Sequence, residues 1–154
     1  MADTIRLEII TSTGPAIEAG IKQLYIPAYL GKAGVLENHK PYISLLKPGE
    51  IFYTDIDNKN HYLYIREGFM EVNSNKIVII SDAVERGETL DKLEIEKKLE
   101  ELDKTIKAST KLVEGMTEEE MIKMPDELAQ AIEEQREFET KLKIVQKITA
   151  DKRC

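Results

Sequence analysis

The hydrophobic pattern of this chain changes its period once, near Thr89, and that change constrains the fold more than any other feature. Before Thr89, apolar residues often recur at every second position, as between Ile5 and Ile9, and turn residues interrupt the pattern frequently. A period of two is typical of half-buried strands. After Thr89 the apolar spacing becomes three and four, the period of an amphipathic helix. We therefore expect a strand-rich unit of about residues 1–87 and a helical unit of about residues 88–154.

Several segments of the first unit have the composition or alternation of strands. They include residues 5–10, 19–26, 42–46, 51–54, 61–66, 69–72 and 76–81. The pattern makes about eight to ten short strands, which favours a β-sandwich or a barrel. Pro27 is expected to end the second of these segments. The β-branched run at residues 76–81 is typical of a strand buried on both faces.

Two apolar stripes at helical spacing follow Thr89. The first comprises Ile95, Leu99, Leu102, Ile106, Ser109 and Val113, and the second comprises Leu128, Ala131, Gln135, Phe138, Leu142 and Val145. Gly115 is expected to stop the first helix and Pro125 to begin the second. The pattern predicts an antiparallel two-helix hairpin. Its stripes must cover each other, or part of each must lie on the strand-rich unit or on another protein.

A glycine-containing segment between two of the strands has an unusual order of residues. Its sequence is Gly31-Lys32-Ala33-Gly34-Val35-Leu36-Glu37-Asn38-His39-Lys40-Pro41, and Lys47-Pro48-Gly49-Glu50 follows the next strand. Two glycines three positions apart permit a bend or bulge, so we expect an irregular loop. Pro48 and Gly49 occupy the positions that they have in a type II turn.

This order of residues resembles the signature of the epsilon subunit of bacterial F-type ATP synthases, which is homologous to the mitochondrial delta subunit. In that family Gly-x-x-Gly-(Val/Ile)-Leu-x-x-His-x-Pro leads into an apolar strand and a Lys-Pro-Gly turn. The resemblance extends from about Ile5 to Leu90 and weakens in the helical tail. It implies a β-sandwich followed by an α-helical hairpin.

The resemblance also implies a function. The chain would be a non-catalytic rotor part of the central stalk of the proton-translocating ATP synthase. Its sandwich would bind the gamma subunit and the c-ring, so that their rotation is coupled to ATP synthesis. Its helical hairpin would restrain ATP hydrolysis by switching between folded and extended states. The protein would lie at the cytoplasmic face of the bacterial membrane and would be attached only through its partners.

The resemblance assigns residues to two contacts. The residues implied to contact the gamma subunit or the c-ring are Gly31, Lys32, Gly34, Leu36, His39 and Pro41. The residues implied to reach acidic segments of the catalytic beta subunits are Lys141, Lys143, Lys147, Lys152 and Arg153. His39 has a second interpretation as a loop residue that only forms hydrogen bonds. The five basic residues at the end of the second helix also have a second interpretation, because basic residues complement the dipole at the C-terminus of a helix.

The chain departs from the family at two positions. Lys32 stands where related sequences often carry an acidic residue that faces the c-ring. Asp91 matches the nucleotide-binding motif of some members, but Glu94 occupies the position of its arginine. An arginine pairs with phosphates through a planar fork of donors, whereas a glutamate repels them. We therefore expect ATP binding to be weak or absent.

Composition excludes several classes of partner and cofactor. The formal net charge is −7, so nucleic acids and anionic lipids are poor candidate partners. The single cysteine, Cys154, cannot form an internal disulfide and fits a reducing compartment. No apolar run reaches the ~18 residues of a membrane span, and the N-terminus has no leader pattern, so we expect a soluble protein. No metal spacing, phosphate loop or nucleophile motif is present, so no cofactor is expected.

Two other functions are compatible with these patterns. The chain could be a freestanding β-sandwich binding module that dimerises through its helical hairpin and is unrelated to the synthase. A small barrel enzyme that uses His39 and Glu37 ranks third. His61, beside a turn, is expected to be a surface residue at the end of a strand.

Overall fold

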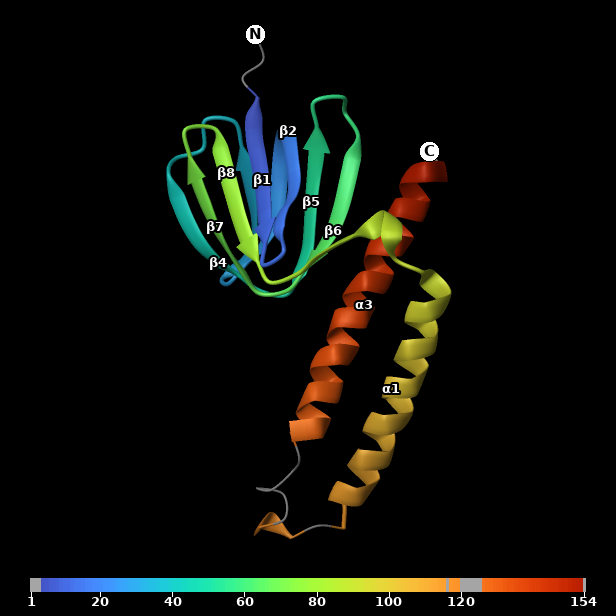
Figure 1. The fold of residues 1–154 in the computed structure, drawn as a ribbon. Helices are drawn as coiled ribbons and strands as arrows, with labels where there is room; N and C mark the ends of the chain where they lie inside the picture. Colours follow the sequence, from blue (N-terminus) through green and yellow to red (C-terminus); the bar gives the residue numbers. More distant parts are fainter. Residues whose placement is uncertain (1–3, 116, 120–125, 154) are drawn as a thin grey trace.

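The computed structural model describes residues 4–115, 117–119 and 126–153. Its strands are β1 (Ile5–Thr11), β2 (Gly14–Ala28), β3 (Gly31–Leu36), β4 (Tyr42–Leu46), β5 (Gly49–Asp55), β6 (Asn60–Ile65), β7 (Gly68–Asn73), β8 (Lys76–Ser81) and β9 (Val84–Arg86). A 3₁₀ turn, η1 (Gly87–Thr89), then leads to the two long helices, α1 (Lys92–Val113) and α3 (Asp126–Arg153). The helices extend beyond one end of the strand-rich unit (Figure 1).

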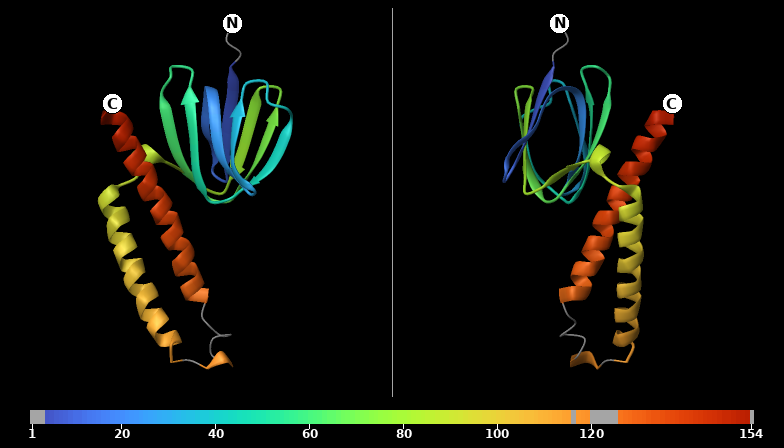
Figure 2. Two further views of the ribbon diagram at one scale, coloured as in Figure 1. Left: turned by 180° about the vertical axis from the view of Figure 1, so that it is seen from behind. Right: turned by 45° about the vertical axis from the view of Figure 1, so that its right-hand side comes forward.

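The strands form two sheets that face each other (Figure 1, Figure 2). One sheet contains the first half of β2 with β1, β8, β7 and β4, and the other contains β3, the second half of β2, β5, β6 and β9. Strand β2 belongs to both because its pairing passes from β1 to β5 at a register shift between Ile21 and Gln23. Gly20 lies at this corner, where a Cβ atom would approach Thr4 Cγ2 to 3.0 Å. The predicted β-sandwich is confirmed.

The core lies between the two sheets and is largely aliphatic. Alternate residues of each strand point into it, so Ile5, Leu7 and Ile9 of β1 are buried. The same alternation buries Ile77 and Ile79 of β8. The buried residues of this core all belong to the sandwich, and none belongs to the described parts of the helices. The sandwich therefore has a complete core of its own.

Helices α1 and α3 run antiparallel and pack along the predicted stripes. The most buried members of these stripes are Ile95, Leu102, Leu128 and Ala131. Lys98 Nζ lies 3.3 Å from Glu134 Oε1 and joins the two helices at their edge. The predicted helical hairpin is thus confirmed. Pro125 and the side chain of Val113 lie outside the described residues.

The expected irregular loop is wrong in its first half. Residues 31–36 form strand β3, which pairs with the second half of β2, and only residues 37–41 link β3 to β4. Pro27 does not end β2 but lies inside it, opposite Lys32. Proline lacks only the N–H, and the Pro27 carbonyl still accepts a hydrogen bond of 2.9 Å from the Lys47 N–H.

Two further expectations are wrong. Strand β8 is buried on one face only, since Ile80 is 51% exposed and Val78 is half-buried. The reason is that α3 covers the other sheet and leaves this one open. The turn before β5 is not of type II, because Gly49 begins the strand and does not have the positive φ that such a turn requires.

Candidate functional site

An apolar row crosses the outer side of the sheet that contains β1, β8, β7 and β4. The strand register places Leu45 opposite Phe69, Phe69 opposite Ile80, and Ile80 opposite Ile10. Neighbouring strands lie about 4.8 Å apart, so the row is roughly 15 Å long. Ile43 lies on the same side, two residues along β4. We call these five residues the outer apolar face.

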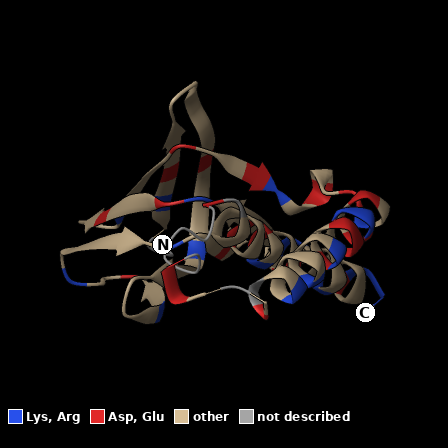
Figure 3. Cartoon of the chain, turned by 90° about the horizontal axis from the view of Figure 1, so that it is seen from below, with Lys and Arg blue, Asp and Glu red and all other residues tan. Residues whose placement is uncertain are grey.

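The outer apolar face is open to solvent. Ile43, Leu45 and Ile80 are each more than half exposed, and Phe69 is 39% exposed. Single exposed apolar residues are common on proteins, but a continuous row across four strands is typical of a contact surface. Charged residues are frequent along the two helices, while long stretches of the strands carry neither charge (Figure 3).

The C-terminal half of helix α3 lies against the outer side of the opposite sheet, at β5 and β6 (Figure 1, Figure 2). There Glu50, Tyr64 and Glu85 form a row across β5, β6 and β9. The Nζ atom of Lys141 lies 2.6 Å from Glu85 Oε2 and 5.0 Å from the centre of the Tyr64 ring. The Nζ atom of Lys147 donates to both carboxylate oxygens of Glu50, at 3.0 and 2.7 Å. We call this contact between α3 and the sandwich the docked state.

Lys141 is the only buried charged residue among those that the structure describes, with 7% of its side chain exposed. Its Nζ also lies 2.6 Å from Glu137 Oε1 and 4.8 Å from the centre of the Phe138 ring. Burial acts to lower the pKa of Lys141, but the hydrogen bonds to Glu137 and Glu85 outweigh it and leave that pKa raised. Burial also raises the pKa of Tyr64 to about 12. The ammonium therefore remains charged in a well-paired position.

A close approach of α3 to turn η1 completes the docked state. A Cβ atom on Gly87 would lie 2.5 Å from Ile148 Cδ1 and 2.8 Å from Ile144 Cγ2. Only a glycine leaves room for these two side chains. Further along α3, the Tyr62 hydroxyl donates a 2.7 Å hydrogen bond to Asp151. Burial and this bond together raise the pKa of Tyr62 to about 12.

The residues expected in one partner-binding loop lie at two ends of the sandwich. Gly31 and Lys32 are at the turn between β2 and β3, whereas Leu36, His39 and Pro41 are at the other end of β3. A six-residue strand separates its ends by about 17 Å. The structure therefore does not bring these residues together in a single site.

Two of these residues have local structural roles. Gly34 lies in the middle of β3, where a Cβ atom would approach Tyr25 Cε1 to 3.0 Å. It leaves room for the Tyr25 ring and does not have a positive φ. His39 is half-buried, its Nδ1 lies 2.7 Å from the Lys40 carbonyl oxygen, and its ring packs edge-on against Tyr42.

The basic end of α3 is divided in the same way. Lys141 and Lys147 form ion pairs with the sandwich, whereas Lys143, Lys152 and Arg153 are exposed. Sequence patterns did not indicate this division, because all five residues are basic and close together in the chain. An acidic partner could reach the last three residues directly, but it would have to displace the sandwich to reach the first two.

Asp91 caps the first helix. Its Oδ1 accepts hydrogen bonds from the N–H groups of Leu93 at 2.9 Å and Glu94 at 3.4 Å. Such a cap stabilises a helix by about 1 kcal/mol. The carboxylate is thus engaged with backbone donors, as the N-cap position requires. Its presence is explained without a nucleotide.

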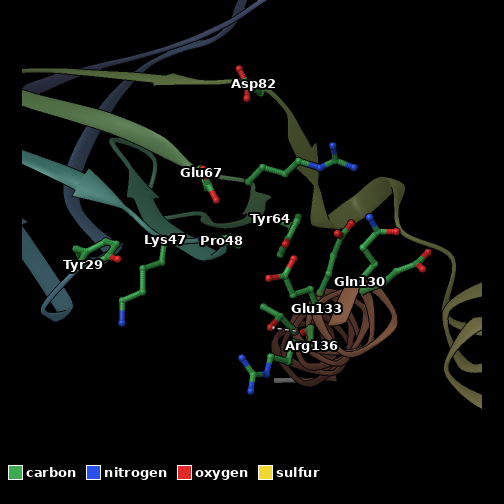
Figure 4. Close-up of a pocket in the computed structure, with 13 residues that line it drawn as sticks. Tyr29, Lys47, Pro48, Tyr64, Glu67, Asp82, Gln130, Glu133 and Arg136 are labelled. Carbon is green, nitrogen blue, oxygen red and sulfur yellow. Dashed lines mark hydrogen bonds between the residues drawn. The ribbon is translucent and has the colours of Figure 1, made fainter. Parts of the chain in front are cut away.

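A cleft of about 790 Å³ separates the rim of the sandwich from the first half of α3 (Figure 4). Its charged lining residues are Lys47, Arg66, Glu67, Asp82, Glu133, Glu134, Arg136 and Glu137. Five carboxylates thus face three cations. This lining does not offer the excess of cationic donors that nucleotide phosphates require.

Within the described part of the chain, no group of three or more His, Cys, Asp and Glu residues could hold a metal ion. None of the described helices has the length and apolar character needed to cross a membrane.

The fold and its surfaces define a class of protein: a β-sandwich with one open apolar face, followed by a helical hairpin that docks on the other. Comparison with known families identifies it more closely. The family model described as "ATP synthase, Delta/Epsilon chain, beta-sandwich domain" matches residues 4–87. The chain belongs to this family, as the resemblance of its glycine-containing segment predicts.

Relatives support the same assignment. The ATP synthase epsilon chain of Desulfosudis oleivorans is 32% identical over 108 residues, which cover 70% of this chain and 81% of the relative. The ATP synthase epsilon chain of Carboxydothermus hydrogenoformans is 35% identical over 91 residues, which cover 59% and 67%. A chain in the structure of the mitochondrial ATP synthase of Euglena gracilis has the same fold, with a TM-score of 0.64 and 23% identity, over 87% of this chain and 79% of that one.

Proposed function

We propose that this chain is a non-catalytic subunit of the central stalk of an F-type ATP synthase. Membership of the delta/epsilon family supports this role, as do the curated relatives named ATP synthase epsilon chain. In this proposal the chain rotates with the gamma subunit and the c-ring and couples their rotation to ATP synthesis. It lies at the cytoplasmic face of the membrane, bound only through its partners.

The outer apolar face is the observation that carries the proposal, and we assign it to the gamma subunit. The chain covers one outer side of its sandwich with α3 and leaves this row open. The loop at residues 37–41 leads directly into β4, which supplies Ile43 and Leu45. Pro41 therefore directly precedes this face, and Leu36 and His39, at the same end of the sandwich, would extend the same contact.

The opposite end of β3 is assigned to the c-ring. Gly31 and Lys32 lie there, about 17 Å from Leu36. In this proposal one end of β3 faces the gamma subunit and the other end faces the c-ring. Such an arrangement suits a subunit that links these two parts of a rotor. Gly31 has a φ of +136°, which L-residues rarely adopt, so it sets the shape of this turn.

The helical hairpin is proposed to restrain ATP hydrolysis by leaving the docked state. Its contact with the sandwich uses ion pairs on one helix, a type of contact that an acidic competitor can replace. Lys141 and Lys147 would exchange their sandwich partners for an acidic segment of a catalytic beta subunit. Lys143, Lys152 and Arg153 are already exposed and would begin the encounter.

The outer apolar face can be tested by purifying the tagged full-length protein from its native membranes. Full burial of a Leu or Ile side chain is worth about 1.5–3 kcal/mol. Leu45→Asp, which also places a charge in the contact, should reduce recovery of the gamma subunit about 10-fold or more. Ile56→Asp is the matched control, because Ile56 is 53% exposed but lies in the turn between β5 and β6. If both variants recover the gamma subunit equally well, the outer apolar face is not the gamma-binding surface.

The regulatory part is tested by truncation after Glu88. The sandwich core contains no residue of the described helices, so the remaining fragment should unfold cooperatively and still bind gamma. The ATPase rate of the assembled complex should rise, and an unchanged rate would remove the inhibitory role.

Calorimetric titration of the isolated protein with ATP should show no binding tighter than roughly millimolar.

The alternative of a freestanding module with a dimerisation hairpin loses its basis. It required a chain unrelated to the synthase, whereas residues 4–87 match the delta/epsilon family. In addition, Ile95, Leu102, Leu128 and Ala131 of the helical stripes are buried without a second copy of the chain. The enzyme alternative has no support in the placement of His39, which contacts the Lys40 carbonyl and Tyr42.

A further inference from the structure

We propose that the turn between β2 and β3 binds an acidic protein segment, and that the ion pair between Lys147 and Glu50 couples this binding to docking of the helical hairpin. The inference rests on the proposed c-ring contact and specifies the charge of the partner segment. It also connects that contact to the regulatory helix.

The turn is an exposed projection, which we call the β2–β3 tip and define as residues 29–32 with Lys47 and Pro48. Leu30 is fully exposed, at 101%, and Tyr29 is 66% exposed. The Tyr29 N–H donates to the Leu45 carbonyl at 3.1 Å, and the Lys47 N–H donates to the Pro27 carbonyl at 2.9 Å. These bonds hold the tip against the end of β4.

The tip is positively charged although the protein is acidic. The Lys32 Nζ lies 5.8 Å from the centre of the Tyr25 ring, and the Lys47 Nζ lies 5.9 Å from that of Tyr29. The Lys47 side chain extends from the sheet on the same side as Tyr29 (Figure 4). Two ammonium groups beside an exposed Leu and Tyr suit a partner segment with carboxylates next to an apolar side chain.

Glu50 connects the tip to the helical hairpin. A hollow of about 330 Å³ is lined by Pro27, Ala28, Gly31, Lys32, Lys47, Pro48 and Glu50. Glu50 is the one acidic residue of this lining, and Lys147 of α3 binds both of its carboxylate oxygens. In the docked state Lys147 therefore neutralises the Glu50 charge, so the lining of this hollow presents Lys32 and Lys47 with no unpaired carboxylate of its own.

Release of α3 would remove Lys147 and expose the Glu50 charge beside the two lysines. An acidic segment would then bind the tip less tightly, by roughly two- to five-fold for one added like charge near the protein surface. The coupling is reciprocal, so occupation of the tip would stabilise the docked helical hairpin by the same factor. A subunit that has lost its c-ring contact would release its hairpin more readily.

A protein segment fits the tip better than a lipid surface. Basic clusters that bind anionic membranes usually contain about four to eight Lys or Arg residues, whereas the tip has two. The formal net charge of −7 also opposes approach to an anionic surface.

The test measures binding of the full-length protein to detergent-solubilised c-rings of its own synthase, at low and moderate salt. The double variant Lys32→Gln/Lys47→Gln should weaken binding at least five-fold and reduce its salt dependence. Lys59→Gln is the matched control, an exposed lysine in the turn between β5 and β6, and should leave binding unchanged. Lys147→Gln should weaken binding two- to five-fold, and Glu50→Gln/Lys147→Gln should restore it.

Each outcome separates this inference from the proposed function. If the wild-type protein does not bind c-rings, the c-ring contact itself is wrong. If it binds but the lysine variants bind equally well, the contact stands and the acidic partner is excluded. If Lys147→Gln has no effect, or the double variant does not restore binding, the coupling is excluded. Binding to vesicles of phosphatidylcholine and phosphatidylglycerol that requires Lys32 and Lys47 would overturn the inference in favour of a lipid headgroup.

Discussion

Replacing Lys141 by Met should weaken docking of the helical hairpin by about 1–2 kcal/mol without destabilising the sandwich. Glu137 and Phe138 lie on α3 with Lys141 and stay beside it in both states, so their contacts cancel. What docking adds is the pair with Glu85 and the contact with the Tyr64 ring. Because the Glu85 side chain is 44% exposed, its pair is worth about 0.5–1 kcal/mol, and the ring contact adds a similar amount.

The docked population can be measured by electron spin resonance between two spin labels. Suitable sites are Lys59→Cys in the sandwich and Lys97→Cys in α1, in a chain that carries Cys154→Ser. The wild-type protein should give one dominant distance. Lys141→Met should reduce the docking constant about five- to thirty-fold, as 1–2 kcal/mol requires, and a second, broader distance should appear.

Two variants, each with a glutamate replaced by glutamine, provide the matched comparison. Glu85 and Glu137 each lie 2.6 Å from Lys141 Nζ, but only Glu85 belongs to the sandwich. Glu85→Gln should lower the docking constant about two- to five-fold, and Glu137→Gln should leave it nearly unchanged. An unaltered distance distribution in Lys141→Met, or equal effects of the two glutamines, would refute the reasoning.

Three further predictions concern close contacts and titration. Gly87→Ala should abolish the docked distance, because its Cβ would overlap Ile144 and Ile148, whereas Gly115→Ala, whose nearest contact would be 3.9 Å away, should preserve it. Gly34→Val should lower the free energy of unfolding in urea by about 1–3 kcal/mol, because its side chain would press on Tyr25; an unchanged midpoint would contradict this. The pKa values of Tyr62 and Tyr64 are about 12 in the folded protein against 10.0 ordinarily. The unfolded chain therefore loses these protons first, and the free energy of unfolding should fall as pH rises from about 10 to 12. In denaturant titrations, Tyr62→Phe should make this fall with pH less steep. An equally steep fall in Tyr62→Phe would contradict the raised pKa of Tyr62.

The sandwich and the helical hairpin could be predicted from the sequence because their burial follows a simple period. The face of α3 that meets α1 is apolar, so its stripe from Leu128 to Val145 is visible in the pattern. The face that meets the sandwich contains Lys141, Lys147 and Asp151 between apolar residues. The ion pairs of this face give no hydrophobic signal, and Ile144 and Ile148, which pack at Gly87, lie outside the stripe that the pattern indicated.

Other errors have equally local causes. Strand β3 contains two glycines, which disfavour a strand in isolation, and its pairing with β2 overrides that preference. The apolar run of β8 was consistent with burial on both faces, because a contact surface and a core use the same residue types. Ile80 is exposed where a second layer was expected. The candidate partner-binding surface was therefore hidden by its resemblance to a core strand.

The central claim is that the outer apolar face attaches this subunit to gamma. Site-specific photo-crosslinking in native membranes tests it most directly, with a benzophenone amino acid in place of Leu45 and, as a control, in place of Ile56. Both positions are more than half exposed, so reactivity alone cannot separate them. The account predicts a covalent adduct with the gamma subunit from position 45 and none from position 56. An adduct only from position 56, or adducts from neither, would contradict it.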